Sequence, residues 1–567
     1  MRDQNVIIAG AAGEGIQSIG EVFSDTLSAC GYGIFSWQEF ESRIRGGQSS
    51  FTLRISDNAI NAPKFEADIL LALNEKALAH YRGRLRPGGV LLYEGLGEEE
   101  PGAINVRFSA LAREWFGNRI YANSIAAGTL AGLLGVSLAP LLENIEKNFK
   151  GKEAAVISNN LEAAKRGYDL GKGRRSEASS APLPCLGGNA CLLTGHEALS
   201  LGAAWAGCRF ICAYPMSPST TIITFMAERQ EALGIFVEQA EDEISAINMA
   251  IGASYAGLRA MTATSGGGFA LMNEGVSLAG MTETPVVIVV AQRPGPATGL
   301  PTRTAQGDLL FAINSGHGEF PKAVLAPCDA KDAFEKAVRA FYLAEKFQTP
   351  VIILTDQFLA DSRFSLSDTE FLKKNPGRDV ADPEAVETPY LRYRFTESGI
   401  SPRLFPGQSK HLVCVDSDEH DEAGHITEDL AGTAPSMAAK RLRKLEAMRA
   451  EMTPPEWSGP KDAGTVLVSW GSTKNSVLEA LELLADKGVI AASLHFTELW
   501  PLPPYDFPAK VRLLCVESNS TGQLERLLAG EYGVSFDGFV HRADGLPMDG
   551  AFIAGKVLSP GPKGGNG

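Results

Sequence analysis

The chain reads AYPMSPST at residues 213–220, VEQAEDEISAINMAIGASYAGLRAMTATSGGG at 237–268 and VVIVVAQRPGPATGLPTRTAQGD at 286–308. In order, these strings give a Pro/Ser turn, an acidic start to a small-residue helix, a glycine-rich turn and a loop with two arginines. Apolar strand patterns alternate with the helical patterns here. Such alternation is typical of a doubly wound α/β domain. The sequence therefore predicts one such domain around this stretch.

Two further α/β domains are predicted on either side of it. Before it, apolar strand patterns at 5–10, 68–73 and 90–94 alternate with helical stretches such as 137–150. This favours an α/β domain with a largely parallel sheet. After it, TVLVSWGS at 465–472 opens another strand-and-helix pattern. The predicted fold class is α/β throughout, in three domains.

Changes in composition suggest where these domains end. A segment rich in Gly, Ser, Ala and Pro reads as a flexible linker, and a Pro-rich polar region with an acidic run reads as a solvated excursion. The predicted divisions are a first α/β domain at 1–175, a linker at 176–190, the doubly wound domain at 191–375, a connecting excursion at 376–460, a C-terminal domain at 461–560 and a disordered tail at 561–567.

The overall composition describes a globular protein and excludes several classes of partner. Hydrophobic residues make up 44% and the net charge is -15, which argues against nucleic-acid binding. No apolar run reaches the roughly 20 residues of a membrane span. The N-terminus lacks the pattern of a signal peptide. We expect a cytoplasmic protein without a membrane or nucleic-acid partner.

The cysteines do not form a metal-binding pattern. None of the eight shows CxxC spacing, which disfavours a zinc or iron–sulfur site in this chain. Most lie in apolar surroundings, such as LLCVE around Cys515, and are expected to be small buried side chains. No metal site is expected here.

The first candidate site is GAAGEG at 10–15, which follows a strand and opens a helix. Backbone N–H groups around Gly13 and Gly15 could hold an anion there. The spacing is not the dinucleotide fingerprint and no Walker loop follows, so a structural turn is at least as plausible. Nearby, Arg43 and Arg45 precede two glycines and could bind a phosphate or a partner carboxylate, or lie exposed on a loop.

The second candidate is the acidic helix start formed by Glu241, Asp242 and Glu243. Acids at this position cap helices and interact well with the helix dipole. Capping does not explain why small residues such as Ala246 and Gly252 follow. Small side chains allow another structural element to approach the helix closely. A carboxylate at the buried start of such a helix could exchange a proton with a ligand nitrogen. Both interpretations stay open on the residues alone.

Two further turns offer groups for a ligand. TSGGG at 264–268 joins a strand to a helix through a triple-glycine turn, where backbone can approach a ligand ring or phosphate. The loop that follows the strand at 286–291 carries Arg293 and Arg303 under the constraint of several Pro and Gly residues. Guanidinium groups suit a carboxylate, which they bind in bidentate fashion.

Together these strings resemble the α subunit of the 2-oxoacid:ferredoxin oxidoreductases, most closely the 2-oxoglutarate type with a γ-type domain fused in front. The resemblance covers nearly the whole chain. Its motifs are TGHEALSLGAAWAGCRFICAYPMSPST (194–220), EDEISAINMAIGASYAG (241–257), TATSGGGFALM (262–272), GMTETPVVIV (280–289), GLPTRTAQGDLL (299–310), GHGEFPK (316–322), ESGISPR (397–403), HDEAGH (420–425) and CVESNSTGQLERLL (515–528).

The resemblance implies a γ-type domain, then a domain that binds the pyrimidine of thiamine diphosphate, then a transketolase C-terminal-like domain. The cofactor is expected between the pyrimidine domain and a separate β subunit. That subunit is expected to hold Mg²⁺ and a [4Fe–4S] cluster. Ferredoxin, the 2-oxoacid and coenzyme A are the further expected partners, in an (αβ)₂ assembly.

The resemblance also implies roles for single residues. Glu243 matches the acid that bonds N1′ of the aminopyrimidine, and Arg293 matches the arginine that binds the 2-oxoacid carboxylate. Ser217 stands where the family usually has threonine and Met216 where it has isoleucine, so substrate preference is open. The expected contacts with cofactor further include Tyr214, Pro215, Ser217, Pro218, Ser265, Gly266 and Gly267, with Arg303 as a second substrate arginine. Candidates for contact with coenzyme A are Gly13, Gly15, Arg43 and Arg45.

The function implied is oxidative decarboxylation of 2-oxoglutarate to succinyl-CoA with reduction of ferredoxin, active only with the β subunit. One alternative keeps the chemistry and changes the substrate to pyruvate, a branched-chain 2-oxoacid or indolepyruvate. Another is a non-catalytic assembly subunit in which the acidic helix start serves only as a cap.

Overall fold

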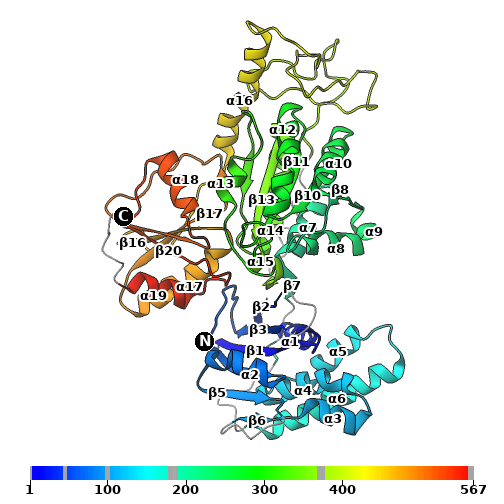
Figure 1. Cartoon of the computed structure of the whole chain (residues 1–567), viewed down its shortest axis with the longest axis vertical. Helices are drawn as coiled ribbons and strands as arrows, with labels where there is room; N and C mark the ends of the chain where they lie inside the picture. Colours follow the sequence, from blue (N-terminus) through cyan, green and yellow to red (C-terminus); the bar gives the residue numbers. More distant parts are fainter. Residues whose placement is uncertain are drawn as a thin grey trace. The chain divides into compact units, whose positions relative to one another are not determined.

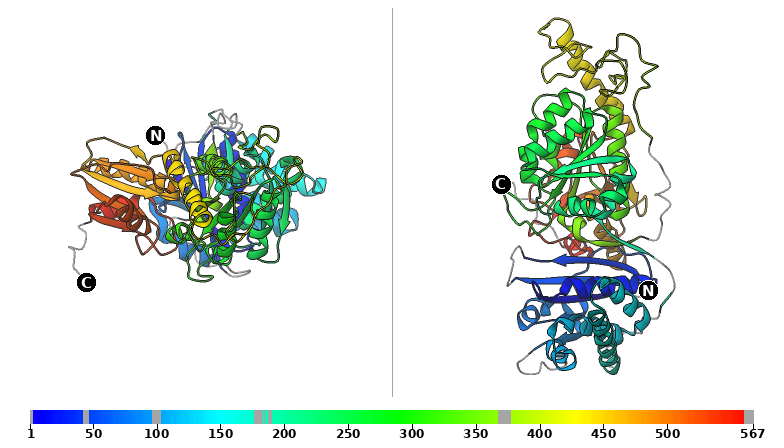
Figure 2. Two further views of the ribbon diagram at one scale, coloured as in Figure 1. Left: turned by 90° about the horizontal axis from the view of Figure 1, so that it is seen from above. Right: turned by 90° about the vertical axis from the view of Figure 1, so that its right-hand side faces the viewer.

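The computed structural model describes residues 3–41, 47–95, 103–175, 183, 185–186, 190–366 and 377–559. Two compact units result, the first from Met1–Leu193 with Asp361–Asp368 and the second from Thr194–Ala360 with Thr369–Gly567. Figures 1 and 2 show their helices and strands. Arg43, Arg45, most of the predicted linker and the predicted tail lie outside the described residues.

The first unit is built on a mixed sheet. Within the described residues the strand order is β6-β5-β4-β1-β3-β2-β14-β7. The strands are β1 (Asp3–Ala11), β2 (Gly33–Glu39), β3 (Gln48–Ser56), β4 (Ala67–Ala72), β5 (Leu85–Tyr93), β6 (Ile104–Asn105), β7 (Cys191–Thr194) and β14 (Arg363–Leu366).

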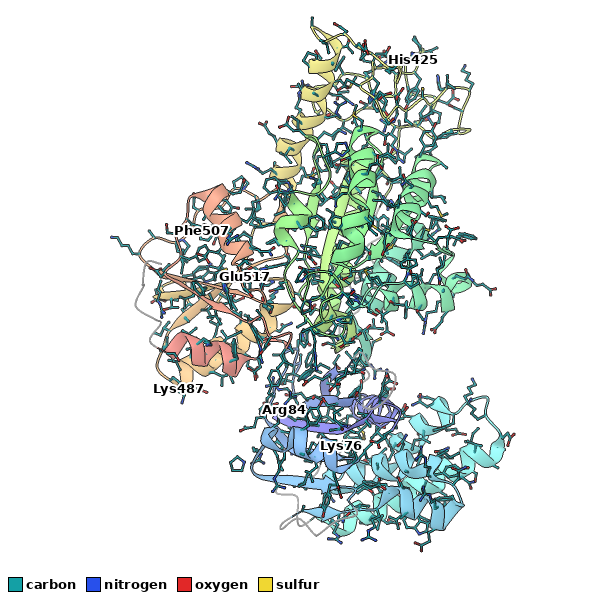
Figure 3. The ribbon with its side chains drawn as sticks, viewed as in Figure 1. Lys76, Arg84, His425, Lys487, Phe507 and Glu517 are labelled. Atoms are coloured by element: carbon teal, nitrogen blue, oxygen red, sulfur yellow. A yellow bond between two sulfur atoms is a disulfide. The ribbon has the colours of Figure 1, made fainter. Side chains whose placement is uncertain are left out.

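The prediction of a largely parallel sheet is wrong for half of this sheet. Strand β1 is parallel to β4, β4 to β5 and β5 to β6, but β3 is antiparallel to both β1 and β2. The connection at 40–47 is shorter than the dozen or so residues that a parallel crossover needs, so β2 and β3 pair antiparallel. Arg84, labelled in Figure 3, pairs with Glu39 at the end of β2.

Helices cover this sheet and pack closely on one another. They are α1 (Ile16–Ala29), α2 (Glu75–Tyr81), α3 (Phe108–Phe116), α4 (Ala122–Leu134), α5 (Leu138–Asn148) and α6 (Ala154–Gly173). A Cβ on Gly128 or Gly132 of α4 would clash with the backbone of α6. The two helices therefore approach each other only because these positions lack a side chain.

One pair of cysteines departs from the sequence-based expectation. Cys30, at the end of α1, forms a disulfide with Cys185, and the backbone N–H of Leu186 donates to Cys30 O at 2.7 Å. Cys191 is exposed, whereas Cys208 and Cys515 are buried free thiols as expected. The disulfide holds the described part of the linker against the end of α1.

The second unit begins with a parallel sheet of order β18-β12-β13-β11-β10-β8-β9, in which β18 alone is antiparallel among the described strands. Its strands are β8 (Cys208–Ala213), β9 (Phe236–Gln239), β10 (Arg259–Thr264), β11 (Val286–Gln292), β12 (Ala323–Leu325), β13 (Pro350–Asp356) and β18 (Glu498–Trp500). Strands β10, β11 and β13 are buried on both faces, as central strands of a parallel sheet are.

Helices lie on this sheet as a doubly wound fold requires (Figure 1). They are α7 (Gly195–Trp205), α8 (Thr220–Glu228), α9 (Gln230–Leu233), α10 (Glu243–Tyr255), α11 (Gly266–Leu271), α12 (Asn273–Met281), α13 (Leu309–Ile313), α14 (Ala330–Phe347) and α15 (Gln357–Asp361). Helices α10, α11 and α12 share a core with strand residues such as Ile288 and Val290. Helix α14 packs on β11, β13 and α7.

The C-terminal segment adds a sheet of order β15-β17-β16-β19-β20. Its elements are β15 (Glu456–Ser458), β16 (Thr465–Trp470), α17 (Lys474–Asp486), β17 (Ala491–Phe496), β19 (Arg512–Glu517), α18 (Gln523–Tyr532), β20 (Gly538–His541) and α19 (Gly550–Leu558). One apolar core contains residues of this sheet and of the preceding one, and Figure 3 labels Glu517 within the C-terminal layer. Both therefore belong to one compact unit.

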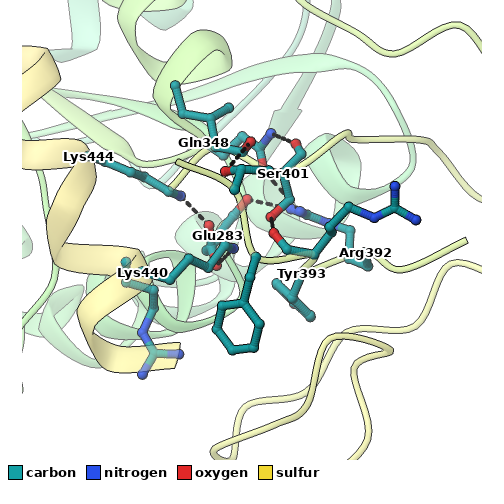
Figure 4. Close-up of polar contacts among 12 residues, drawn as sticks. Glu283, Gln348, Arg392, Tyr393, Ser401, Lys440 and Lys444 are labelled. Carbon is teal, nitrogen blue, oxygen red and sulfur yellow. Dashed lines mark hydrogen bonds and ion pairs between the residues drawn. The ribbon is translucent and has the colours of Figure 1, made fainter. Parts of the chain in front are cut away.

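The excursion after the central domain is held by a buried ionic cluster (Figure 4). Glu283, at the end of α12, pairs with Lys440 and Lys444 of α16 (Thr433–Glu451), and all three side chains are at most 1% exposed. Arg392 donates to Glu283 O at 2.8 Å and to Gln348 Oε1 at 2.9 Å. Burial opposes the charged form of Glu283, but the surrounding cations hold its pKa below the usual value.

Replacing Glu283 by glutamine is expected to lower the free energy of unfolding by about 3–5 kcal/mol, because two lysine charges stay buried without their carboxylate. Denaturant unfolding followed by circular dichroism measures this. The matched control is Glu428→Gln, since Glu428 is exposed. A Glu283→Gln protein as stable as the parent would show that the cluster does not hold the excursion in place.

Candidate functional site

Glu243 lies at the first position of α10, immediately after the residue that caps this helix. The cap is Asp242, whose side chain accepts a hydrogen bond from the backbone N–H of Ser245 at 2.7 Å. Glu243 is 3% exposed, and its Oε1 has no hydrogen-bond partner among the described residues. A buried acceptor without a partner costs about 1–3 kcal/mol. Capping therefore accounts for Asp242 and leaves Glu243 Oε1 oriented for a ligand that donates a hydrogen bond.

Gly268, the last residue of the glycine triplet in α11, lies against the carboxyl group of Glu243. The prediction of a triple-glycine turn is wrong, because Gly266 to Gly268 form the first turn of this helix. A Cβ on Gly268 would lie 2.5 Å from Glu243 Oε1 and would clash with Thr264 Oγ1. Glycine is thus required where the first turn of α11 passes the carboxyl group. Close by, the Oγ of Ser265 is fully buried and, among the described residues, also lacks a partner.

The Pro/Ser turn between β8 and α8 contacts the arginine loop. Arg293 follows β11, and its Nη1 donates to the backbone oxygen of Ser217 at 2.6 Å. Ser217 and Tyr214 are exposed. Below the turn, the ring nitrogens of His196 lie 2.7 Å from Thr221 Oγ1 and from Thr355 Oγ1. The structure therefore brings together two of the predicted residues, Ser217 and Arg293.

Asp308 is a polar residue of the site to which the sequence analysis gave no role. Its carboxylate lies against Gly266, where a Cβ would be 2.6 Å from Oδ2. Burial raises the pKa of Asp308 to about 6, while the positive charge of Arg293 acts in the opposite direction. Burial lowers the pKa of Arg293, and Asp308 opposes that shift. Asp308 also precedes α13 without capping it, whereas an aspartate before a helix is ordinarily read as a cap.

The first turn of α11 connects the two parts of the site. Gly268 at one end contacts the carboxyl group of Glu243, and Gly266 at the other contacts that of Asp308. Asp308 in turn interacts with Arg293, which bonds Ser217. The arrangement offers a buried carboxyl group whose Oε1 has no partner among the described residues and, beyond the first turn of α11, a guanidinium group.

Arg303 lies at the far end of the arginine loop, beside the C-terminal layer. A Cβ on Gly545 would lie 2.9 Å from Arg303 Cβ, and the backbone N–H of Thr304 donates to Gly545 O at 3.1 Å. Gln306 fixes the same segment, because it donates to Trp470 O at 2.7 Å and accepts from Ser518 N at 2.9 Å. The C-terminal layer thus anchors the loop that carries both arginines.

In the first unit, the turn GAAGEG at 10–15 contains the carboxylate of Glu14. Glu14 Oε2 accepts hydrogen bonds from the backbone N–H of Ala11 and from Asn74 Nδ2, each at 2.7 Å. A pocket of about 290 Å³ beside the turn is lined by Gly13, Glu14 and also Glu94, whose pKa is raised by burial. Arg119 lines the same pocket, so its charges are mixed, and both interpretations of GAAGEG stay open.

Two general properties follow from the described residues. No helix among them is long and apolar enough to cross a membrane. In the same ranges, no group of three or more His, Cys, Asp or Glu side chains is placed to hold a metal ion.

Comparisons with known proteins give consistent results. Residues 201–440 match the family described as pyruvate flavodoxin/ferredoxin oxidoreductase, thiamine diphosphate-binding, and residues 5–170 match the family described as pyruvate ferredoxin/flavodoxin oxidoreductase. The α subunit of 2-oxoacid:ferredoxin oxidoreductase 2 of Aeropyrum pernix is 33% identical over 98% of this chain and 97% of its own length.

Two further relatives carry 2-oxoglutarate in their names. The 2-oxoglutarate synthase subunit KorA of Archaeoglobus fulgidus is 37% identical over 59% of this chain and 89% of its own length. The solved structure of the 2-oxoglutarate:ferredoxin oxidoreductase from Magnetococcus marinus, with 2-oxoglutarate, coenzyme A and succinyl-CoA bound, is 31% identical with a TM-score of 0.89. The match covers 98% of this chain and 99% of the solved chain.

Proposed function

This chain belongs to the 2-oxoacid:ferredoxin oxidoreductases, as an α subunit, and from that premise we propose that it serves the oxidative decarboxylation of 2-oxoglutarate to succinyl-CoA with ferredoxin as acceptor. The observation that carries the proposal is the Oε1 of Glu243, which has no partner among the described residues and lies within the segment 201–440 that matches the thiamine diphosphate-binding family. The names of the relatives from Archaeoglobus fulgidus and Magnetococcus marinus support 2-oxoglutarate as the substrate.

The residues present fit thiamine diphosphate. When bound, this cofactor would supply a nucleophilic carbon and an electron sink for the decarboxylation. Glu243 would hold N1′ of the aminopyrimidine and exchange a proton there, since its Oε1 is buried and unpartnered in the described part of the chain. Ser265 would offer a second hydrogen bond from its buried hydroxyl. The further proposed contacts are those of Tyr214, Pro215, Ser217, Pro218, Gly266 and Gly267.

Arg293 would bind the carboxylate of the 2-oxoacid. A guanidinium carries five donors, and the hydrogen bond to Ser217 O engages Nη1. The group therefore keeps a donor geometry that matches a carboxylate while the turn of Ser217 fixes its position. The hydroxyl of Ser217 is exposed at the same turn and would bond the substrate. Arg303 is proposed as a second, more distant substrate arginine.

A β subunit would complete the site. Large apolar side chains are exposed on the elements that carry the site, namely Tyr214 at 39% after β8, Ile244 at 51% and Met249 at 42% on α10, and Leu271 at 54% on α11. A cluster of exposed apolar side chains marks a protein interface. We infer that the β subunit covers this surface and brings the Mg²⁺ site and a [4Fe–4S] cluster. The proposed assembly is (αβ)₂. It would use coenzyme A as a co-substrate and work in the cytoplasm. Gly13, Gly15, Arg43 and Arg45 are the proposed contacts of coenzyme A.

Turnover by the purified αβ complex tests the substrate. Among 2-oxoglutarate, pyruvate, a branched-chain 2-oxoacid and indolepyruvate, we expect the highest kcat/KM for 2-oxoglutarate in a ferredoxin-reduction assay. The chain purified alone is expected to be inactive and without an iron–sulfur spectrum. A higher kcat/KM for another of these acids would overturn the substrate but keep the chemistry. A cofactor-loaded complex that oxidises none of them would instead favour the assembly-subunit alternative.

A further inference from the structure

We propose that His196 is a positioning residue that holds the Pro/Ser turn at 214–219 in register with Arg293, so that Ser217 and Arg293 are placed for the carboxylate of the 2-oxoacid before it binds. The inference rests on the proposed function, because it takes Ser217 and Arg293 as the groups that bind the substrate. It goes beyond that function because it gives a role to a buried histidine below the turn.

The start of helix α7 fixes the backbone of His196. Thr194 and Glu197 form a capping box there: Thr194 Oγ1 accepts from the backbone N–H of Glu197 at 3.1 Å, and Glu197 Oε2 accepts from the backbone N–H of Thr194 at 2.8 Å. His196 lies between them in the first turn of the helix and is 1% exposed. Its ring is therefore shielded from water and depends on protein groups for its hydrogen bonds.

Both ring nitrogens of His196 have a hydroxyl partner. Thr221 Oγ1, on α8, donates to Pro218 O at 3.2 Å. Since a hydroxyl has one hydrogen, Thr221 Oγ1 accepts from Nδ1 of His196, and Nε2 in turn accepts from Thr355 Oγ1, each at 2.7 Å. Burial lowers the pKa of His196 to about 3, so the ring is neutral at neutral pH and keeps this one donor and one acceptor. The imidazole thus joins strand β13 to the Pro/Ser turn.

Thr355 also fixes the strand that leads to Arg293. Its backbone oxygen accepts from Nε2 of Gln292 at 3.2 Å, and Gln292, the last residue of β11, is 1% exposed. Arg293 follows directly, and its Nη1 donates to Ser217 O at 2.6 Å. One residue of β13 is therefore bonded to both branches of the proposed substrate site.

These contacts close a ring of hydrogen bonds and chain segments. When every polar group of such a network has its partner, the network rigidifies the segments that it joins. Groups that are ordered before a ligand binds lose less conformational entropy on binding. His196 joins the turn to the sheet, so the ring opens when either of its hydrogen bonds is lost. The members are Thr355, His196, Thr221, Pro218, Ser217, Arg293 and Gln292.

The test is Thr221→Val in the αβ complex, because valine keeps the branched shape and removes the hydroxyl. Thr221 is exposed, so the change leaves the core intact. We expect KM for the 2-oxoacid to rise about three- to tenfold, the range for one side chain that has to be ordered on binding, with kcat changed less than about twofold. Thr221→Ser keeps the hydroxyl and should restore the KM of the parent. A parent-like KM in Thr221→Val, or a KM in Thr221→Ser as high as in Thr221→Val, would overturn the proposal.

A control and a double variant separate positioning from a general loss of stability. Ser200 Oγ donates to His196 O at 2.7 Å, outside the ring, so Ser200→Ala removes a buried hydrogen bond of the same helix and should keep the parent KM. In an Arg293→Ala background, Thr221→Val should raise KM by less than about twofold, because the ring acts through Arg293 and the two effects are then not additive. An equal rise of KM in Ser200→Ala, or fully additive effects in the double variant, would contradict positioning.

Thr355→Val is a second, independent variant. It cuts the ring on the other side of His196 and keeps the backbone bond of Thr355 to Gln292. KM should rise as in Thr221→Val, and a parent-like KM would contradict the proposal, so the inference is tested even if one of the two variants does not fold. Failure of the proposed function is a separate result, since it appears as absent oxoacid turnover in the parent complex, against which each variant is measured.

Discussion

Glu243→Gln is expected to lower the oxoacid-dependent reduction of ferredoxin by about 10²–10⁴-fold in the complex with the β subunit, which is the range for loss of a positioned acid or base. Glutamine keeps the size of the side chain but cannot exchange the proton at Oε1. The carboxyl group is buried, and its Oε1 has no hydrogen-bond partner among the described residues. We expect thiamine diphosphate to bind more weakly as well, as measured by the circular dichroism of the bound cofactor.

The matched control is Glu241→Gln, two residues away and exposed. If the acids at this helix start served only to stabilise the helix, both variants would lose similar stability and keep their activity. Gly268→Ala gives an independent route to the same site, because its Cβ would press on Glu243 Oε1. Parent-like turnover in Glu243→Gln would remove the catalytic role and leave the assembly-subunit alternative.

Arg293→Ala is expected to lower kcat/KM for the 2-oxoacid by about 30- to 1,000-fold, mostly through KM, since truncating one partner of a hydrogen-bonded charge pair at a binding site costs about 2–4 kcal/mol. Arg293→Lys should recover only part of this loss, because an ammonium group keeps the charge but not the bidentate fork. Steady-state kinetics with increasing 2-oxoacid separates KM from kcat.

Two further variants test whether the loss of activity is specific to Arg293. Arg209→Ala is the surface control, because Arg209 is exposed on β8 and is not part of the site. Arg303→Ala should lose less than Arg293→Ala, since Arg303 lies beside Gly545 in the C-terminal layer. Equal losses in Arg303→Ala and Arg293→Ala would assign the carboxylate to both arginines. A parent-like KM in Arg293→Ala would exclude this residue from substrate binding.

Local sequence patterns predicted most elements of regular structure. The apolar runs at 286–291 and 350–355 became β11 and β13, and the helical spacing after Glu243 became α10. These patterns are informative because each reflects contacts within a few residues, such as one buried face of a helix or a strand buried on both sides. The family resemblance read from the ordered motifs is confirmed by the comparisons.

Pairings between distant segments were harder to predict. The pairing of β2 with β3 was missed because the direction of a strand depends on its connection, not on its own composition. The glycine triplet was taken for a turn, although Gly266 to Gly268 belong to a helix that needs them for contact with other side chains. The pairing of Glu283 with Lys444 joins residues 161 positions apart, and nothing local marks either side chain as buried.

By itself the sequence determined the fold class and the family, and it predicted roles for Glu243, Arg293 and Ser217, because the motifs that carry them are contiguous strings. The tertiary structure decided which oxygen of Glu243 lacks a partner within the described ranges, which acid caps α10, and that Arg293 reaches Ser217 across 76 positions. It also placed the carboxylate of Asp308 against Gly266. The physical reason is that burial and electrostatic interaction depend on distance in space, which folding sets independently of distance along the chain.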